Sequence, residues 1–256
     1  MKTIIFFTLL LPTLAMARVP TIQSHANYFN NLQEDLAWFQ SNEKTIHHND
    51  MRIIFSRVYE AVTLEMENMF NEKQFKNPVW VNKLMLKYVS LYRNALDCSL
   101  TNSCSISPAW ENAFKINEKN SIMPGIQLLY SISAHVNRDL PIALAASDTD
   151  FDSSDYYYDF TRISLIFKRK MPELINIVLD YQYCDINFAD RKIINQTINI
   201  VMNRTRAQAW NYGRALSQTK TIEEENRVLD AIEANTAGEN GTIRTLAPAS
   251  AKMICF

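Results

Sequence analysis

His135 and Asp139 lie four residues apart in the segment SAHVNRDLP, between two apolar stretches that are typical of a buried helix. On a helix, side chains four residues apart stand one above the other, so these two groups face the same neighbours. A buried carboxylate must be paired, hydrogen-bonded, protonated or bound to a metal ion, because a bare charge in the interior is costly. The pair therefore has the chemistry of a general acid and base, or of a metal site.

A further aspartate opens the next helical segment, SSDYYYDFTRISLIF. Two consecutive helices joined by a loop are typically antiparallel neighbours, so the start of this segment should lie near the end of the first one. We therefore expect Asp159 to join His135 and Asp139 as catalytic residues and as ligands of one divalent metal ion. Arg138 or Arg162 would supply the counter-charge. The alternative is a buried hydrogen-bonded network that fixes the helix register.

Six further side chains are candidates for contacts with a substrate. Tyr59 and Thr63 share one face of a predicted helix with Phe55, although a core-facing stripe with polar tips has the same pattern. Arg206 and Trp210 are four residues apart and could clamp an anionic group, or form an ordinary arginine–tryptophan stack at a surface. The predicted substrate-binding residues are Tyr59, Thr63, Asn137, Arg162, Arg206 and Trp210.

The pattern along the chain is helical throughout. Only four glycines occur in 256 residues, and no stretch shows the sustained alternation of a strand. Pro141 cannot donate to the carbonyl of Asn137 and should kink its helix there. We predict an all-α fold, a single-domain helical bundle over residues 18–238, with a buried central helix that carries His135. An irregular C-terminal tail should follow over residues 239–256. Helical spacing recurs near 22–41, 51–72, 78–97, 108–118, 122–146, 156–180, 187–216 and 220–234.

The N-terminal segment MKTIIFFTLLLPTLAMA, residues 1–17, combines an early lysine, an apolar run and a small-x-small ending, as a secretory signal peptide does. We therefore expect a secreted or periplasmic protein. No later stretch is long and apolar enough for a transmembrane segment. The formal charge of −1 lacks the basic excess of a nucleic-acid-binding domain. The expected partner is a small-molecule or lipid ligand, and not a nucleic acid.

Four cysteines are an even number, which permits disulfides in an exported chain. Cys98 and Cys104 flank the loop-like SLTNS and are close enough in sequence to staple it. Cys184 and Cys255 would then form the second pair by elimination, although three connectivities are formally possible. A zinc site built on these cysteines is disfavoured, because no two of them are two residues apart.

Five segments in order resemble the uncharacterised family called domain of unknown function 5995: FSRVYEAVT, SPAWENAF, AHVNRDLPIALA, YYDFTRISLIF and RAQAWNYGRAL. The resemblance extends from about Met51 to Leu216. Its most specific piece is the alanine-histidine-x-asparagine-x-aspartate-leucine-proline core that begins at Ala134. Where the family usually carries an asparagine, this chain has Ser164. The resemblance implies one helical domain and brings no established reaction.

The spacing H-x-x-x-D, followed shortly by proline, also resembles the zinc-dependent phospholipase C and S1/P1 nuclease group. His135 and Asp139 fit that pair. A trinuclear zinc centre of that kind needs several further histidines, and the chain has only His25, His47 and His48 besides. The resemblance therefore does not imply a trinuclear centre here.

Two functions from different classes agree with the sequence. The first is an exported metal-assisted hydrolase that acts on a small or lipidic substrate at His135, Asp139 and Asp159. The second is a non-catalytic exported binding or interaction protein whose buried polar cluster is structural. Asp139→Asn should separate them, because it costs little stability in a metal or catalytic site and roughly 3–5 kcal/mol in a buried ion pair.

Overall fold

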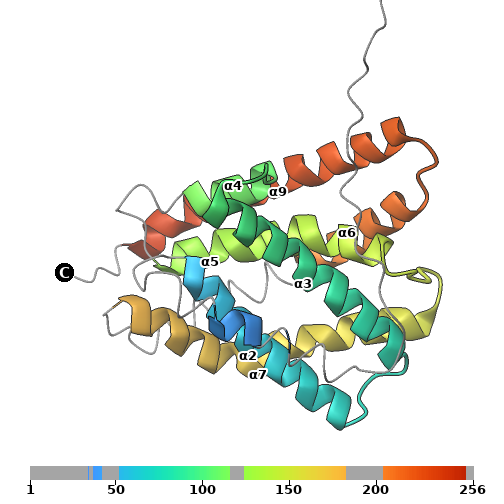
Figure 1. Ribbon diagram of the computed structural model, residues 1–256, viewed down its shortest axis with the longest axis horizontal. Helices are drawn as coiled ribbons and strands as arrows, with labels where there is room; N and C mark the ends of the chain where they lie inside the picture. Colours follow the sequence, from blue (N-terminus) through green and yellow to red (C-terminus); the bar gives the residue numbers. More distant parts are fainter. Residues whose placement is uncertain (1–33, 35–36, 42–51, 116–123, 183–203, 252–256) are drawn as a thin grey trace, which may run out of the picture.

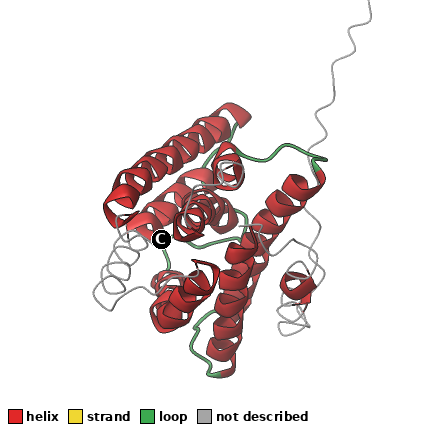
Figure 2. Ribbon diagram, turned by 90° about the vertical axis from the view of Figure 1, so that its left-hand side faces the viewer, coloured by secondary structure: helices red, strands yellow, loops and turns green. Residues whose placement is uncertain are grey.

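The computed structural model describes residues 34, 37–41, 52–115, 124–182 and 204–251. Within these ranges the chain forms helices and connecting loops and contains no strand (Figure 2). The predicted all-α fold is therefore confirmed. The predicted signal peptide over residues 1–17 lies outside the described residues.

The helices are α2 (Arg52–Asn71), α3 (Pro78–Thr101), α4 (Pro108–Lys115), α5 (Pro124–Ser133), η2 (Ala134–Asp139), α6 (Leu140–Ala145), α7 (Ser154–Gln182) and α9 (Ile222–Ala251). Residues 204–217 are also helical. Helices α3, α4 and α5 begin on a proline, whose missing N–H costs nothing in a first turn. Because glycines are scarce, other residues adopt the left-handed conformation after α2, α3 and α6: Lys73, Asn102 and Asp148, with φ of 55°, 51° and 51°.

Helices α5, η2 and α6 follow one another as a central rod through the molecule (Figure 1). The rod lies between α2 and α7 on one side and α4 and α9 on the other, and α3 packs against η2 and α6. The predicted buried central helix is thereby confirmed. Its buried apolar residues include Leu128, Ile132, Ala134, Val136, Leu140, Ala143 and Leu144.

The middle of the rod is a π-helix, η2, instead of a kinked α-helix. The N–H of Leu140 donates to the carbonyl of His135, five residues earlier, as a π-helical turn requires. Pro141 has no N–H to offer the carbonyl of Asn137, so an α-helical bond is missing at the end of this turn. The proline is therefore accommodated by one wide turn, and that turn carries His135 and Asp139.

The predicted irregular tail is wrong as far as Ala251, because α9 continues through Gly238 and Gly241 to that residue. Residues 252–256 lie outside the described part of the chain. The inward face of α9 explains the helix, because buried residues recur every three or four positions: Ile232, Thr236, Glu239, Asn240 and Ile243. Packing of this face outweighs the roughly 1 kcal/mol that each glycine costs in a helix.

Cys98 and Cys104 form the predicted disulfide, with their Cα atoms 5.1 Å apart. The bond joins the last turns of α3 to the loop before α4. It therefore fixes the approach to Trp110, which follows in α4. Cys184 and Cys255 lie outside the described residues, so their pairing stays a prediction.

Gly213, in the helical residues 204–217, packs directly against the rod. A methyl group there would lie 2.9 Å from Leu144 Cβ and 3.2 Å from the Pro141 carbonyl oxygen. Neither atom is the end of a flexible side chain. We expect Gly213→Ala to lower the free energy of unfolding by about 1–2 kcal/mol, although alanine is the better helix former.

Gly238→Ala is the matched control for this substitution in a urea titration. A methyl group at Gly238, inside α9, would meet no atom within 4 Å. It should raise the free energy of unfolding by about 0.5–1 kcal/mol, through helix propensity alone. Changes of the same sign in the two variants would contradict the close packing at Gly213.

Candidate functional site

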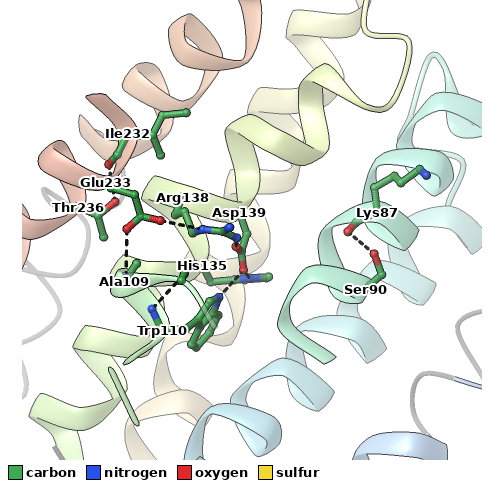
Figure 3. A network of polar contacts seen from close by, with 11 residues as sticks. Lys87, Ser90, Ala109, Trp110, His135, Arg138, Asp139, Ile232, Glu233 and Thr236 are labelled. Atoms are coloured by element: carbon green, nitrogen blue, oxygen red, sulfur yellow. Dashed lines mark hydrogen bonds and ion pairs between the residues drawn. The ribbon is translucent and has the colours of Figure 1, made fainter. Parts of the chain in front are cut away.

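The carboxylate of Asp139 is fully buried and accepts hydrogen bonds from three side chains (Figure 3). Trp110 Nε1 lies 2.9 Å from Oδ2, and His135 Nδ1 lies 3.1 Å from the same oxygen. Arg138 Nη1 lies 2.7 Å from Oδ1. Asp139 is thus both hydrogen-bonded and paired with a cation, which are the conditions for a buried carboxylate.

Arg138 extends the network to α4 and α9. Its Nε donates to Glu233 Oε1 over 3.0 Å, and the other oxygen of Glu233 accepts the backbone N–H of Ala109 over 3.1 Å (Figure 3). Burial disfavours the guanidinium, but the attraction of Asp139 and Glu233 outweighs it and raises the pKa of Arg138. One carboxylate therefore holds both the arginine of η2 and the first turn of α4.

The imidazole of His135 is surrounded by aromatic rings. Its ring is stacked on Tyr88 of α3, with centroids 3.6 Å apart and an angle of 13° between the planes. Four further rings lie within 5.1–6.1 Å of it, those of Phe55, Tyr59, Tyr92 and Trp110. His135 is only 3% exposed. Burial lowers its pKa, and the hydrogen bond to Asp139 offsets part of this effect. The histidine is therefore held neutral at physiological pH.

The contact with Asp139 decides which nitrogen of His135 carries the proton. A carboxylate only accepts hydrogen bonds, so Nδ1 is the donor and Nε2 of the neutral ring has a free lone pair. Nε2 is buried and has no hydrogen-bond partner among the residues that the structure describes. A buried acceptor without a donor is uncommon in a folded protein and indicates a position for another molecule or a strained site.

Asp159 does not join the pair. Its two oxygens accept the backbone N–H groups of Lys76 and Asn77, over 2.9 and 2.6 Å, immediately before α3. No three His, Cys, Asp or Glu side chains among the described residues are arranged to hold a metal ion. The predicted three-ligand set is therefore not assembled. Asp159, near the start of α7, lies at the N-terminus of α3 instead.

Of the predicted substrate-binding residues, Tyr59 lies nearest to His135, with its ring edge-on at 5.1 Å. Thr63 is buried one turn further along α2 and donates to the Tyr59 carbonyl. Asn137 is buried on η2, where its amide nitrogen donates to Ser133 Oγ over 3.1 Å. Its side-chain oxygen has no hydrogen-bond partner within the described part of the chain. The structure therefore gives Tyr59 a direct contact with the histidine, and gives Thr63 and Asn137 contacts within their own helices.

The two predicted arginines have separate surroundings. Arg162 donates to Gln74 over 3.3 Å and lies over the ring of Tyr158, at the loop between α2 and α3. Arg206 is buried, donates to Ser164 and lies 5.9 Å from the ring of Phe160. Burial lowers the pKa of Arg206 to about 10, so it remains charged at neutral pH.

Trp210 packs in an aromatic cluster of its own. Its ring lies 4.9–5.1 Å from three others, those of Phe151, Tyr157 and Phe160. Arg206 and Trp210 therefore both pack on Phe160, within the core. The predicted surface stack is wrong, because both side chains are buried, whereas the predicted anion clamp stays a prediction.

Three residues of the network were not predicted from the sequence: Tyr88, Trp110 and Glu233. Trp110 lies in the segment SPAWENAF, but an aromatic residue in a short amphipathic helix indicates only burial. Glu233 follows Arg138 by 95 residues, so no local spacing connects them. A pairing of this kind becomes visible only once α9 is placed against the rod.

A comparison with protein families bears on the whole domain. The model of one family of unknown function, DUF5995, matches residues 32–246. The chain belongs to DUF5995. No curated protein and no solved structure matches it. The buried network of Asp139 is therefore a feature of a DUF5995 domain, and the resemblance to the zinc-dependent phospholipase C group finds no support. In the described part of this domain, no helix is both long and apolar enough to cross a membrane.

The lowered pKa of His135 predicts an acid-sensitive stability in this DUF5995 domain. In the unfolded chain a histidine has a pKa near 6.5, which is above its value in the folded domain. Between these two values the unfolded state binds more protons, so stability should fall as the pH drops below about 6.5. His135→Leu should flatten this dependence between pH 5 and 7, measured by urea unfolding at each pH. An equally steep fall in the variant would assign the effect to other groups.

Proposed function

We propose that this DUF5995 protein is an exported hydrolase in which His135 acts as the general base and Asp139 orients it. The observation that carries the proposal is the buried lone pair on His135 Nε2, with Nδ1 held by Asp139 over 3.1 Å. A histidine held in one tautomer by a carboxylate, with the opposite nitrogen free, has the arrangement that general-base catalysis needs. The substrate would be small or lipidic, because aromatic rings surround the imidazole.

The reaction follows from the protonation states of the pair. Nε2 takes a proton from a water molecule as the water oxygen bonds to the carbonyl carbon of an ester. The imidazolium formed is stabilised by Asp139, and its Nε2–H then protonates the leaving alkoxide. The products are an acid and an alcohol, and the histidine returns to its neutral state. No step uses Asp159, because its oxygens are bound to the backbone before α3.

Export is part of the proposal and has two supports. The first is the signal-peptide pattern of residues 1–17. The second is the disulfide between Cys98 and Cys104, a bond that persists in secreted and periplasmic proteins and is rare in the cytosol. The chain is accordingly proposed to act outside the cytoplasm.

A second candidate is a non-catalytic exported binding or interaction protein, and a specific observation favours it. Asp139 has three donors, and Arg138 has two carboxylates, so the charges of the network are paired within the protein. Such a network can be purely structural, because it fixes the register of η2 against α4 and α9. The two candidates differ in whether His135 reacts.

The experiment is a screen of the oxidised protein against uncharged carboxylic esters and against phosphodiesters, which are anionic. Any turnover found is then measured in the His135→Gln variant. Loss of a general base should reduce kcat by about 10²–10⁴-fold. Ser147→Ala is the matched control, a buried polar substitution just after α6 whose hydroxyl donates to the Ala143 carbonyl. Turnover unchanged by His135→Gln, or absent from the parent protein, would favour the binding protein.

A further inference from the structure

The acceptor on His135 restricts what can bind beside it. Nδ1 already donates to Asp139, and burial keeps the ring neutral, so Nε2 offers a lone pair and no proton. A ligand must therefore bring the hydrogen to this contact. Hydroxyl groups and protonated amines qualify, whereas a carboxylate or a phosphate dianion would place its own lone pairs against that of Nε2.

The surroundings of His135 disfavour charged ligands of either sign. The groups around the imidazole are the rings of Tyr88, Phe55, Tyr59, Tyr92 and Trp110, with Asp139 below it. An anion would be buried among these rings without a donor from the histidine, which is costly.

An ammonium group would be attracted by the aromatic faces. It would also be repelled by the charge of Arg206, whose guanidinium lies within electrostatic range of the hydroxyl of Tyr88, the ring stacked on His135. The negative charge of Asp139 offers little compensation, because Arg138 Nη1 already lies 2.7 Å from it.

We propose that the site takes an uncharged, largely apolar molecule that donates one hydroxyl group to His135 Nε2. The inference rests on the proposed function, because both use the same nitrogen. In the hydrolytic reaction this molecule is the alcohol half of an uncharged ester. When the ester bond breaks, the proton on Nε2 passes to the alkoxide oxygen, so the released alcohol ends as the donor in this contact. A ligand that binds to this buried residue only in the folded state would raise the stability of the protein.

Four probes of similar size test the inference: phenol, toluene, benzoate and benzylammonium. We expect phenol to raise the melting temperature of the protein most and to bind about tenfold more tightly than toluene, the difference of one buried hydrogen bond. In the His135→Leu variant, the affinity for phenol should fall to that for toluene, and the affinity for toluene should not change. Benzoate or benzylammonium binding more tightly than phenol would overturn the inference, and so would an absence of binding by all four.

Nitrogen NMR of the unmodified protein detects the contact with His135 directly, so this measurement needs no folded variant. Phenol should shift the His135 Nε2 resonance in the direction of a hydrogen-bonded nitrogen, and toluene should not. Turnover separates this inference from the proposed function. Equal kcat/KM for phenyl acetate and for its para-carboxylate analogue would overturn the inference while leaving His135 as the base. If phenol bound but no ester were hydrolysed, the proposed hydrolase would be wrong and the inferred class of ligand would stand.

Discussion

Asp139→Asn should lower the free energy of unfolding by about 3 kcal/mol, so stability alone does not separate the enzyme from the binding protein at this residue, which is both paired with Arg138 and bonded to His135. The substitution keeps the shape of the side chain but removes the charge that Arg138 meets at 2.7 Å. Breaking a buried ion pair by changing one partner typically costs roughly 3–5 kcal/mol, and Glu233 still compensates part of the arginine charge. The new amide must also turn its NH₂ group towards one of the existing donors. Urea unfolding monitored by circular dichroism measures the effect.

Asp152→Asn is the control for the same chemical change at an exposed ion pair. The Asp152 side chain is 91% exposed and lies 3.2 Å from Arg214. Its loss should change stability by less than about 1 kcal/mol. If Asp139→Asn proved as mild as the control, the carboxylate would not be the anion of a structural pair. Its place at His135 would then be purely functional.

Asp159→Ala should cost about 3 kcal/mol through a different mechanism. The carboxylate is fully buried and accepts the N–H groups of Lys76 and Asn77, the two residues before α3. Each N–H left without its acceptor costs roughly 1–3 kcal/mol where water does not replace it. The loss should appear as faster hydrogen exchange at the start of α3. The nitrogen resonances of His135 should keep their positions, because no hydrogen bond or ring contact among the described residues joins Asp159 to His135.

Asp155→Ala, one turn earlier on α7, is the matched control. Asp155 pairs with Lys76 at 2.6 Å, but both side chains are about half exposed, at 52% and 50%. An exposed pair contributes about 0–1 kcal/mol, so this variant should unfold almost as the parent does. A shift of the His135 resonances in Asp159→Ala, without one in Asp155→Ala, would restore Asp159 to the site.

The sequence was sufficient to predict the helices and the pair on one of them. Glycine scarcity and apolar spacing are local properties, and so is the i, i+4 spacing of His135 and Asp139, which η2 preserves as a direct contact. The prediction of an irregular tail after residue 238 is wrong because a glycine costs only about 1 kcal/mol inside a helix. The buried face of α9 depends on packing with α5 and η2, which the sequence does not display.

The members of the site that the sequence did not predict are those that arrive from distant helices. Tyr88 comes from α3, Trp110 from α4 and Glu233 from α9, and each meets η2 only through tertiary packing. Asp159 was predicted on the right helix but with the wrong partner: it binds the backbone N–H groups of Lys76 and Asn77 and not the His135–Asp139 pair. A buried carboxylate must find donors, but its sequence position does not say whether they are side chains or backbone.

Because Glu233 binds both Arg138 and the Ala109 N–H, we expect Arg138, Asp139 and Glu233 to co-vary among related proteins. Loss of Glu233 alone would remove one of two acids from Arg138 and the acceptor of the Ala109 N–H from α4. Loss of Arg138 alone would leave two acids without their shared cation. Members of DUF5995 are therefore expected to carry all three residues or to have replaced them together, although 94 positions separate Asp139 from Glu233 in the chain.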